Sequence, residues 1–347
     1  MEHLSQRVNG RLIRHIAAEC GFDIAGVTAA RPIPDFERFH DWVERGLAGE
    51  MRYLTDHRAN VRSDLNQLLA GVRSVISVGL LYNGPEPYSR DFNDPERAWI
   101  SRYAWGADYH PLIRKKLEEM AGKLLQTEPF QWRACVDTAP LLERSFARQA
   151  GLGWIGKNTC LINQQRGSWF FLGELLTTLE LDPDFPAPDR CGTCTRCIDT
   201  CPTQAIVPSP QGRYELDARH CISYFTIELR AAIPEPQRTA MGHHVFGCDI
   251  CQDVCPWNRK APAHAARARP DLFAPPLERL AGLSETEFKQ MFRDTPVNRA
   301  KYNGFLRNVA VAMGNAGQEA FRAPLERLAA SPDPLVREHA NWALAKL

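Results

Sequence analysis

The residues of this chain with the most evident chemistry are its cysteines. The segment CGTCTRCIDTCP runs from Cys191 to Pro202 and places four cysteines in eleven residues. A second segment, CDICQDVCP, runs from Cys248 to Pro256 and adds three more. Because thiolates are strong metal ligands, this density indicates bound metal.

The spacing of the first segment identifies the kind of metal site. It follows the C-x2-C-x2-C-x3-C-P pattern of bacterial ferredoxins, in which three close cysteines hold one cluster and the fourth binds the other. We therefore predict two 4Fe-4S clusters with crossed ligands. One cluster takes Cys191, Cys194, Cys197 and Cys255, and the other takes Cys201, Cys221, Cys248 and Cys251.

A pair of zinc sites is the alternative for these cysteines. Zinc prefers separate C-x2-C knuckles that close a tetrahedron, and the run ending in Cys201-Pro202 fits that arrangement poorly. Iron–sulfur clusters are therefore favoured. They transfer single electrons, but the spacing does not identify the acceptor.

Composition and the N-terminus bear on the compartment. The first residues, MEHLSQRVNGRLIRHIAAECG, are charged and amphipathic, without an apolar run typical of a signal peptide or a membrane span. With 42 Lys and Arg against 41 Asp and Glu, no global field favours a polyanion. We expect a cytoplasmic protein, in which disulfides are rare. The scattered Cys20, Cys135 and Cys160 are then expected to be buried small side chains.

The length of 347 residues allows two or three domains. The proline-rich segment LDPDFPAPDR, residues 181–190, is expected to be a linker. The predicted fold class is an α+β multidomain protein. Its predicted parts are an α/β domain over residues 1–185, a ferredoxin-like domain over 186–260 and α-helical HEAT-like repeats over 270–347.

Hydrophobic periodicity and turn residues predict the elements of the first part. A hairpin is expected over residues 159–181, with its turn near Arg166 and Gly167. Helices are predicted over 4–21, 35–45, 111–126 and 141–153, and strands over 22–28, 73–82 and 132–137.

The C-terminal region contains an internal repeat. RNVAVAMGN from Arg307 and REHANWALA from Arg337 align thirty residues apart, with Ala310 opposite Ala340. Helices with small residues on one face can stack and share a core, which is typical of HEAT-like repeats.

The segment GLGWIGKN, Gly151–Asn158, matches the dinucleotide-binding pattern G-x-G-x-x-G. That pattern requires a preceding strand and a following helix, whereas here a helix precedes and a strand follows, so we reject this reading. We expect the glycines to let the backbone approach another flat or bulky ligand, with polar contacts from Lys157 and Asn158.

Asp137 lies in CVDTAP at the end of a predicted strand. Two interpretations remain open from position alone. The carboxyl can serve as a general acid at a strand end, or it can cap the following helix.

Several motifs together resemble one family, the epoxyqueuosine reductases. They are GFDIAGVT, ISRYAWGADYH, VDTAPLLERSFARQAGLGWIGKNT, RHCISYFTIE and HHVFGCDICQDVCPWN, together with the first cysteine segment, and they extend over nearly the whole chain. The resemblance implies cobalamin as a further cofactor beside the two 4Fe-4S clusters. It implies reduction of the epoxide of epoxyqueuosine in tRNA to queuosine, the last step of queuosine biosynthesis. The implied partners are the anticodon stem-loop of that tRNA and an external low-potential electron donor, with no membrane and a monomeric chain.

The resemblance also implies roles for residues. Asp137 becomes the proton donor, and the cluster bound near Ser223, Tyr224 and Asp249 in sequence becomes the immediate electron donor to cobalt. The implied contacts to the corrin are Arg58, Tyr103, Asp137, Thr138, Gly156, Lys157, Asn158, Ser223, Tyr224, Cys248 and Asp249.

For tRNA, the candidate region is the start of the first helical repeat. Residues 289–308 hold five basic residues against one acidic residue, and such side chains bind phosphates; a solvated helix face is the alternative. The candidate tRNA contacts are Arg299, Lys301, Arg307 and Asn308.

Two other functions compete with this interpretation. One is a cobalamin-dependent reductive dehalogenase, whose respiratory members carry a twin-arginine leader. The other is a non-catalytic iron–sulfur module that binds nucleic acid. Cobalamin binding and salt-sensitive binding of an anticodon stem-loop distinguish the three.

Overall fold

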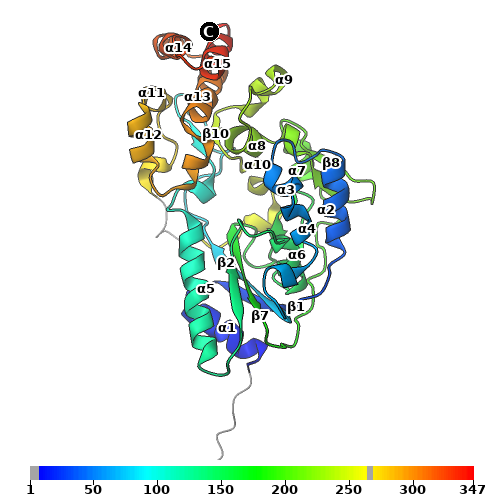
Figure 1. The fold of residues 1–347 in the computed structure, drawn as a ribbon. Helices are drawn as coiled ribbons and strands as arrows, with labels where there is room; N and C mark the ends of the chain where they lie inside the picture. Colours follow the sequence, from blue (N-terminus) through cyan, green and yellow to red (C-terminus); the bar gives the residue numbers. More distant parts are fainter. Residues whose placement is uncertain (1–7, 264–268) are drawn as a thin grey trace, which may run out of the picture. The chain divides into compact units, whose positions relative to one another are not determined.

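The computed structural model describes residues 8–263 and 269–347, which form two compact units (Figure 1). Unit 1 consists of residues 8–83, 109–194 and 256–263, and unit 2 of residues 84–108, 195–255 and 269–347. Each unit is thus assembled from separated segments. This division differs from the three consecutive domains that we expected, because their boundaries were placed at changes in composition rather than at changes in packing.

The centre of unit 1 is a four-stranded antiparallel sheet with the order β1-β2-β7-β4. Its strands are β1 (Ile24–Ala29), β2 (Ser74–Leu81), β7 (Phe170–Thr177) and β4 (Trp132–Cys135). β2 is buried along its whole length, as its run of apolar and β-branched residues predicts. The predicted strands over 22–28, 73–82 and 132–137 are confirmed.

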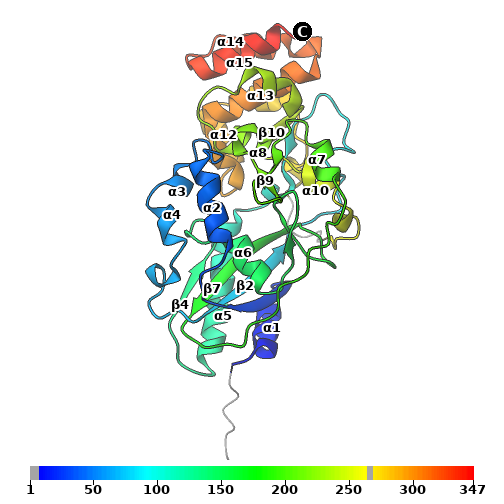
Figure 2. The same ribbon diagram turned by 90° about the vertical axis from the view of Figure 1, so that its right-hand side faces the viewer.

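Helices cover both faces of this sheet (Figures 1 and 2). On one face, α5 (Tyr109–Leu125) lies so close to β7 that a side chain at Gly173 would come within 2.6 Å of Ile113. On the other face, Phe146 of α6 (Glu143–Gln149) packs into a cluster with Leu176. The remaining elements of unit 1 are α1 (Gly10–Glu19), α2 (Asp35–Glu44), α3 (Arg52–Thr55), α4 (Arg58–Val61), η1 (Leu65–Gln67), β5 (Trp154–Ile155), β6 (Leu161–Ile162) and η5 (Pro256–Asn258).

The hairpin predicted over residues 159–181 is wrong. A turn is present, because Asn163 and Gly167 exchange backbone hydrogen bonds, but β6 pairs with β5 and β7 lies between β2 and β4. Burial on both faces decides the position of β7, and a local pattern of apolar residues does not reveal the partners of such a strand. Since all pairings in this sheet are antiparallel, the rule for ligand sites at the carboxyl ends of parallel strands does not apply to Asp137.

Unit 2 combines short strands with most of the helices. β3 (Trp99–Ile100) pairs in parallel with β10 (His244–Phe246), and β8 (Ile206–Pro208) pairs antiparallel with β9 (Tyr214–Leu216). Its helices are η2 (Arg102–Ala104), α7 (Arg196–Thr200), η3 (Ala218–His220), α8 (Ile222–Ile227), α9 (Glu235–Arg238), η4 (Thr239–Met241), α10 (Ile250–Asp253), η6 (Pro270–Leu272), α11 (Leu277–Ala281), α12 (Glu285–Met291), η7 (Pro296–Ala300), α13 (Tyr302–Ala316), η8 (Glu319–Phe321), α14 (Arg322–Ala329) and α15 (Pro334–Leu344).

The C-terminal helices share one hydrophobic core with the rest of unit 2. This cluster joins Trp99, Trp105 and Phe246 to Phe292 and Phe305. The aligned Ala310 and Ala340 are both fully buried, and α13 packs against α15. The helices after residue 270 therefore do not form a core of their own.

The predictions for the first two helices and for the scattered cysteines are confirmed in part. Helices are present over Gly10–Glu19 and Asp35–Glu44, while residues 4–7 of the first predicted helix lie outside the described residues. Cys20 and Cys135 are buried as expected, but Cys160 is half-buried. Throughout residues 8–263 and 269–347, no helix combines the length and apolar character needed to cross a membrane.

Candidate active site

Asp137 lies at the tip of a tight turn directly after β4. The N–H of Thr138 donates to the carbonyl of Val136, which closes a three-residue turn, and Asp137 has a φ of 50°. A γ-turn with positive φ is rare and strained in L-residues. Such strain persists where surrounding contacts impose it, and it is concentrated at functional sites.

The side chain of Asp137 is held from α5. Its Oδ2 accepts a hydrogen bond from the Tyr109 hydroxyl at 3.0 Å and lies 3.1 Å from Nε2 of His110. The Asp137 side chain is 51% exposed, whereas that of His110 is 16% exposed. The carboxyl is therefore oriented by protein groups on one side and open on the other, as a proton donor requires.

Two carboxyl groups lie beneath the turn, Glu143 half-buried and Glu174 fully buried. Glu143 accepts a hydrogen bond from the backbone N–H of Asp137, and Glu174 of β7 is fully buried beside Glu143. Burial, together with the charge of Asp137, raises the pKa of Glu143 to about 8. Burial and the neighbouring Glu143 also raise the pKa of Glu174 well above its ordinary value. Since two adjacent carboxylates cannot both ionise in a buried site, the pair retains a proton at neutral pH.

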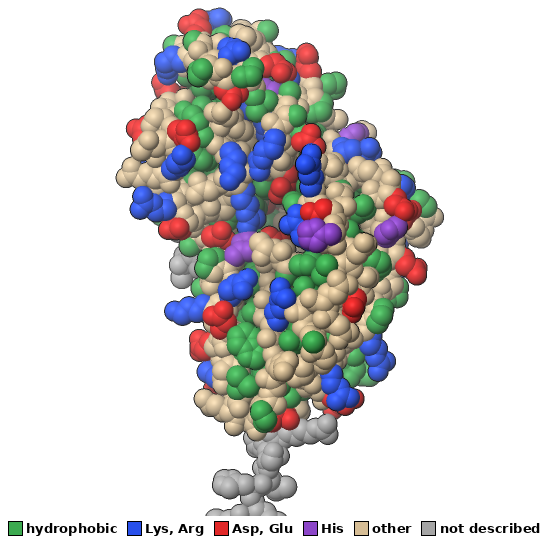
Figure 3. Space-filling model, in the orientation of Figure 1, with side chains coloured by type: hydrophobic (Ala, Val, Ile, Leu, Met, Phe, Trp, Pro, Cys, Tyr) green, Lys and Arg blue, Asp and Glu red, His purple; other side chains and the backbone are tan. Residues whose placement is uncertain are grey.

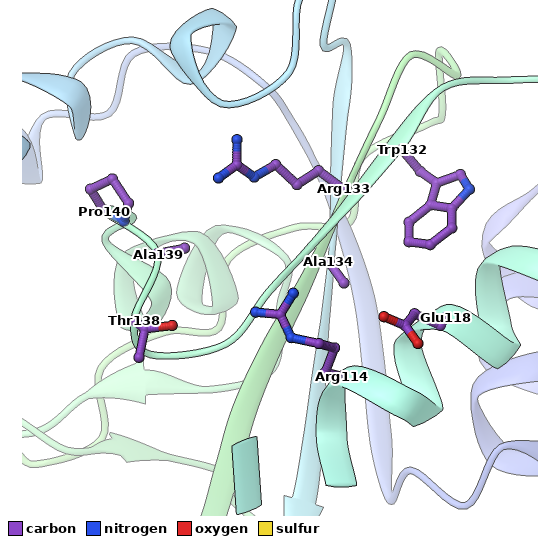
Figure 4. A pocket seen from close by; sticks show the side chains of 8 residues that line it. All are labelled: Arg114, Glu118, Trp132, Arg133, Ala134, Thr138, Ala139 and Pro140. Atoms are coloured by element: carbon purple, nitrogen blue, oxygen red, sulfur yellow. The ribbon is translucent and has the colours of Figure 1, made fainter. Parts of the chain in front are cut away.

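A small pocket adjoins the other side of the turn (Figure 4). Its volume is about 360 Å³. The side chains of Trp132 and Arg133 extend from opposite sides of β4. A corrin ring with its side chains is far larger than such a cavity, so this pocket does not hold cobalamin. Its lining residues are Arg114, Glu118, Trp132, Arg133, Ala134, Thr138, Ala139 and Pro140.

The packing of the chain itself explains the glycines of GLGWIGKN. A side chain at Gly153 would come within 2.1 Å of the Ile162 carbonyl, and one at Gly156 would come within 2.5 Å of the Ile162 side chain. This segment therefore needs glycine for its own packing against β6. Asn158 is buried, and its Oδ1 accepts from the N–H of Cys160 at 3.2 Å.

Lys157 supports the first cysteine turn. Its ammonium donates to the carbonyl of Gly192 at 2.8 Å and to that of Cys194 at 3.0 Å. Within the same turn, the N–H of Cys194 donates to the carbonyl of Cys191. Lys157 therefore orients the backbone that carries two predicted cluster ligands.

In unit 2, Cys201 and Cys221 interact electrostatically with Cys248. Burial, with the nearby charges of Cys221 and Cys201, raises the pKa of Cys248 well above its ordinary value. Burial likewise raises the pKa of the Cys221 thiol, while the N–H groups of Tyr224 and Ser223 act in the opposite direction. Iron would replace these thiol protons, because thiolates are the ligands.

Backbone donors and helix packing also suit an iron–sulfur site. The N–H of Ala205 donates to Sγ of Cys201 at 3.3 Å, and α7, which carries Cys197, packs against α10, which carries Cys251. Hydrogen bonds to the sulfurs are a normal feature of 4Fe-4S sites. The donor set therefore fits the clusters, while the assignment of each cysteine stays a prediction.

Asp249 is a buried structural anchor beside Cys248. Its carboxylate accepts from the Ser101 hydroxyl at 2.5 Å, from the N–H of Arg102 at 2.7 Å and from the indole of Trp99 at 3.3 Å. These bonds fix the second cysteine segment to β3 and the turn after it. The contact of Asp249 with the corrin stays a prediction, and the geometry gives this side chain an internal role.

The other predicted corrin contacts differ in accessibility. Tyr103 and Ser223 are half-buried and Thr138 is exposed, so these side chains fit a role in holding a flat macrocycle. Tyr224 is buried, and Arg58 binds the Asp56 carboxylate through both Nε and a terminal nitrogen. Of these predicted contacts, Arg58 and Thr138 belong to unit 1, and Tyr103, Ser223 and Tyr224 belong to unit 2.

The tRNA prediction is wrong for Arg307 and Asn308. Both are buried in α13: Arg307 donates to the carbonyls of Phe225, Leu229 and Ala231, and Asn308 donates to those of Thr226 and Val245. Burial lowers the pKa of Arg307 to about 10. A guanidinium enclosed in this way cannot reach a phosphate, and it instead ties α13 to α8 and the loop after it.

Lys301 and Arg299 remain candidates. Lys301 is exposed at the start of α13, and Arg299 is half-buried just before it. Figure 3 shows Lys and Arg side chains gathered over the part of unit 2 that contains α8 and α13. Their tRNA contacts stay a prediction.

Sequence reasoning missed Tyr109, His110, Glu143 and Glu174. Glu174 carried a signal, since it is the one charged residue of the apolar strand FFLGELLT, and such residues are rarely buried without a partner. The other three gave none, because their proximity to Asp137 depends on how α5 and α6 pack.

Comparisons with known proteins identify the family to which nearly the whole chain is similar. Residues 190–258 match the family model of a 4Fe-4S double cluster binding domain, and residues 62–138 match that of epoxyqueuosine reductase QueG, DUF1730. The chain is 44% identical over 341 residues to the epoxyqueuosine reductase of Xanthomonas campestris pv. campestris, covering 96% of this chain and 95% of the relative. It is 44% identical over 344 residues to that of Pseudomonas aeruginosa, covering 96% and 93% respectively.

Solved structures agree with these relatives. A crystal structure of epoxyqueuosine reductase with a tRNA-Tyr epoxyqueuosine-modified stem loop matches with a TM-score of 0.87 at 29% identity. The Streptococcus thermophilus enzyme matches at 0.87 and 30%, and a Bacillus subtilis structure with its catalytic aspartate loop swung out matches at 0.86 and 28%. Each match covers 97% of this chain and 89% of the other. The chain therefore belongs to the epoxyqueuosine reductase family.

Proposed function

We propose that this protein reduces the epoxide of epoxyqueuosine in tRNA to give queuosine, the last step of queuosine biosynthesis. The observation that carries this proposal is the 44% identity to epoxyqueuosine reductases over 96% of the chain. The relative crystallised with an epoxyqueuosine-modified stem loop supports tRNA as the substrate.

The parts of the chain match the stoichiometry of the reaction. Conversion of an epoxide to an alkene takes up two electrons and two protons, and the oxygen leaves as water. Two 4Fe-4S clusters can pass the electrons singly from an external low-potential donor. Cobalamin, when bound, supplies a reduced cobalt that acts as a strong nucleophile or electron donor.

Each cluster has a place in this relay. The cluster of Cys201, Cys221, Cys248 and Cys251 is the immediate donor, because its ligands adjoin the candidate corrin contacts Ser223 and Asp249 in sequence. The cluster of Cys191, Cys194, Cys197 and Cys255 receives electrons first.

Asp137 delivers a proton to the departing oxygen. Its half-exposed carboxyl, its strained turn and its hydrogen bond from Tyr109 support this role. The Bacillus subtilis relative, whose catalytic aspartate loop has been seen swung out of the active site, supports a catalytic turn of this kind.

The remaining site residues bind the cofactor and the tRNA. Thr138, Tyr103 and Ser223 have the exposed surface to contact the corrin. Lys301 and Arg299, at the start of the helices that we interpret as HEAT-like, contact phosphates of the stem-loop.

The test is anaerobic reconstitution of the chain with iron, sulfide and cobalamin, followed by reaction with epoxyqueuosine-containing tRNA and a strong reductant. Mass spectrometry of the tRNA nucleosides should show queuosine replacing epoxyqueuosine. Turnover of an aryl halide without conversion of the tRNA would indicate a dehalogenase instead. Binding of tRNA without cobalamin uptake or any product would indicate a non-catalytic module.

A further inference from the structure

The carboxyl groups of Glu143 and Glu174 have no assigned part in the reaction, yet they lie directly beneath its candidate acid. Glu143 is the first residue of α6 and binds the backbone N–H of Asp137 six residues earlier. Glu174 stands in the middle of β7, opposite Ser77 of β2 and Cys135 of β4. Burying a charged side chain at the centre of a sheet costs folding free energy, so we expect such a residue to have a further role.

The surroundings of Glu174 leave Glu143 as its polar neighbour. Among the described residues, no N–H or hydroxyl group donates a hydrogen bond to either oxygen of Glu174, and the Ser77 hydroxyl is itself without a partner. The Cys135 thiol opposite is buried, and its pKa is raised to about 12 by burial and then by the charge of Glu174. A buried carboxyl in this position is stable only if it shares a proton with Glu143.

We propose that Glu143 and Glu174 form a carboxyl pair that positions Asp137 for proton donation, with Glu143 holding the backbone of the turn and Glu174 keeping a proton beneath it. This inference rests on the proposed function of Asp137 as the acid.

The pair acts on Asp137 through the backbone of the turn. Glu143 accepts the Asp137 N–H, which stabilises the strained turn and so fixes where the Asp137 side chain points.

Several other charged groups surround the pair. Arg144 acts on Glu143 in the direction of a lower pKa, but its guanidinium donates to the carbonyl of Thr159. His110 faces the side chain of Asp137 from α5. Arg62 also interacts electrostatically with Glu143, and Arg133 and Arg114 act on Cys135.

The first readout is independent of turnover. Infrared difference spectra of the chain without substrate should show a buried protonated carboxyl group at pH 7. Glu174→Gln should weaken this band, because it removes one of the two carboxyl groups that hold the proton. The matched control Glu119→Gln, on the exposed side of α5, should retain it.

The second readout is the single-turnover rate of pre-reduced enzyme as a function of pH. Glu143→Ala removes the acceptor of the Asp137 N–H and should slow the reaction by about 100-fold, as expected for a misplaced catalytic group. Glu143→Gln keeps an acceptor oxygen but no charge and should cost only about tenfold at pH 7. The rate of this variant should also lack the pH dependence near pH 8 that ionisation of Glu143 gives the wild type. Partial rescue by Gln separates positioning from a general loss of folding.

Each outcome decides between the two proposals. Absence of the protonated carboxyl band, or a Glu143→Ala enzyme at the wild-type rate while Asp137→Asn is slow, would overturn the role of the pair alone. An Asp137→Asn enzyme at the wild-type rate would overturn the role of Asp137 as acid. If Glu174→Gln fails to fold, the Glu143 variants and their pH profiles decide the question by themselves.

Discussion

The cysteine segment of residues 190–258 and the turn that carries Asp137 are proposed to supply electrons and protons to the same reduction, but they are built differently. The cysteines are close in sequence, and their spacing sets much of the cluster geometry before the chain is packed. The orientation and the electrostatic surroundings of Asp137 are set by groups from three elements: Tyr109 and His110 of α5, Glu143 of α6 and Glu174 of β7.

The difference shows where each function is vulnerable. A thiolate is the preferred ligand of cluster iron, and a serine hydroxyl binds iron more weakly, so a single change should remove a cluster. The acid site is an arrangement of ordinary groups, so single changes there should lower the rate by graded amounts. Cys201→Ser and Asp137→Asn test this contrast directly, and variants of Arg307, Lys157 and Lys301, in order of decreasing expected effect, test the residues around the two sites.

Cys201→Ser should remove one cluster and abolish queuosine formation. The iron content after reconstitution should fall to about half that of the wild type, because each cluster is held by its own four cysteines. Iron and sulfide analysis with electron paramagnetic resonance measures this. Cys160→Ser, a change of a half-buried cysteine outside both segments, should leave the iron content unchanged. Full iron and full activity in Cys201→Ser would contradict the ligand assignment.

Arg307→Met should lower the stability of the protein rather than its affinity for tRNA. The change leaves the carbonyls of Phe225, Leu229 and Ala231 without their donor, so the free energy of unfolding should fall by about 3 kcal/mol. Denaturant unfolding measures this loss. Arg327→Met, on an exposed position of α14, should change it by less than about 0.5 kcal/mol. An unchanged stability with weaker tRNA binding would restore Arg307 as a tRNA contact.

Lys157→Met should weaken the link between the glycine segment and the first cysteine turn. Loss of the bonds to the Gly192 and Cys194 carbonyls removes a charge-assisted anchor, and the first cluster should form more slowly, by about threefold. The rate of cluster formation during reconstitution measures this effect. Cobalamin affinity measured in parallel shows whether Lys157 also contacts the corrin, and a loss of cobalamin with normal cluster formation would reverse our assignment.

Lys301→Ala should have the smallest effect, a roughly threefold weaker affinity for the stem-loop, because it removes one phosphate contact. The slope of log affinity against log salt should decrease by about one. Lys115→Ala, on an exposed position of α5, serves as the control and should bind tRNA like the wild type. An unchanged affinity and salt slope in Lys301→Ala would mean that this stretch is a solvated helix face.

The parts of the molecule that the sequence predicted well are those with local determinants. The strand of residues 73–82 is a run of buried apolar residues, and the double-cluster segment matches its family model from residue 190 to 258. Helix periodicity likewise predicted α5, whose buried residues recur at helical spacing.

The parts that it missed depend on packing between distant segments. The position of β7 between β2 and β4 is set by burial on both faces, which a local hairpin pattern does not reveal. Arg307 was predicted to contact phosphate because it lies in the basic stretch of residues 289–308, and no local signal shows that it binds carbonyls near residues 225–231. The pairing of Glu143 with Glu174 joins residues thirty-one positions apart through the packing of α6 on the sheet.

The proposal that the clusters supply electrons while Asp137 supplies a proton is tested most directly by Asp137→Asn in a single-turnover experiment. Asparagine tolerates the positive φ of this turn and keeps the shape of the side chain, but it cannot give up a proton in the same way. Wild-type and variant enzymes are loaded with iron, sulfide and cobalamin, reduced to the same extent and mixed with epoxyqueuosine-containing tRNA. We predict equal cluster reduction and a rate of queuosine formation about 10²–10⁴-fold lower in the variant. Queuosine formed at the wild-type rate would contradict the role of Asp137 as the proton donor.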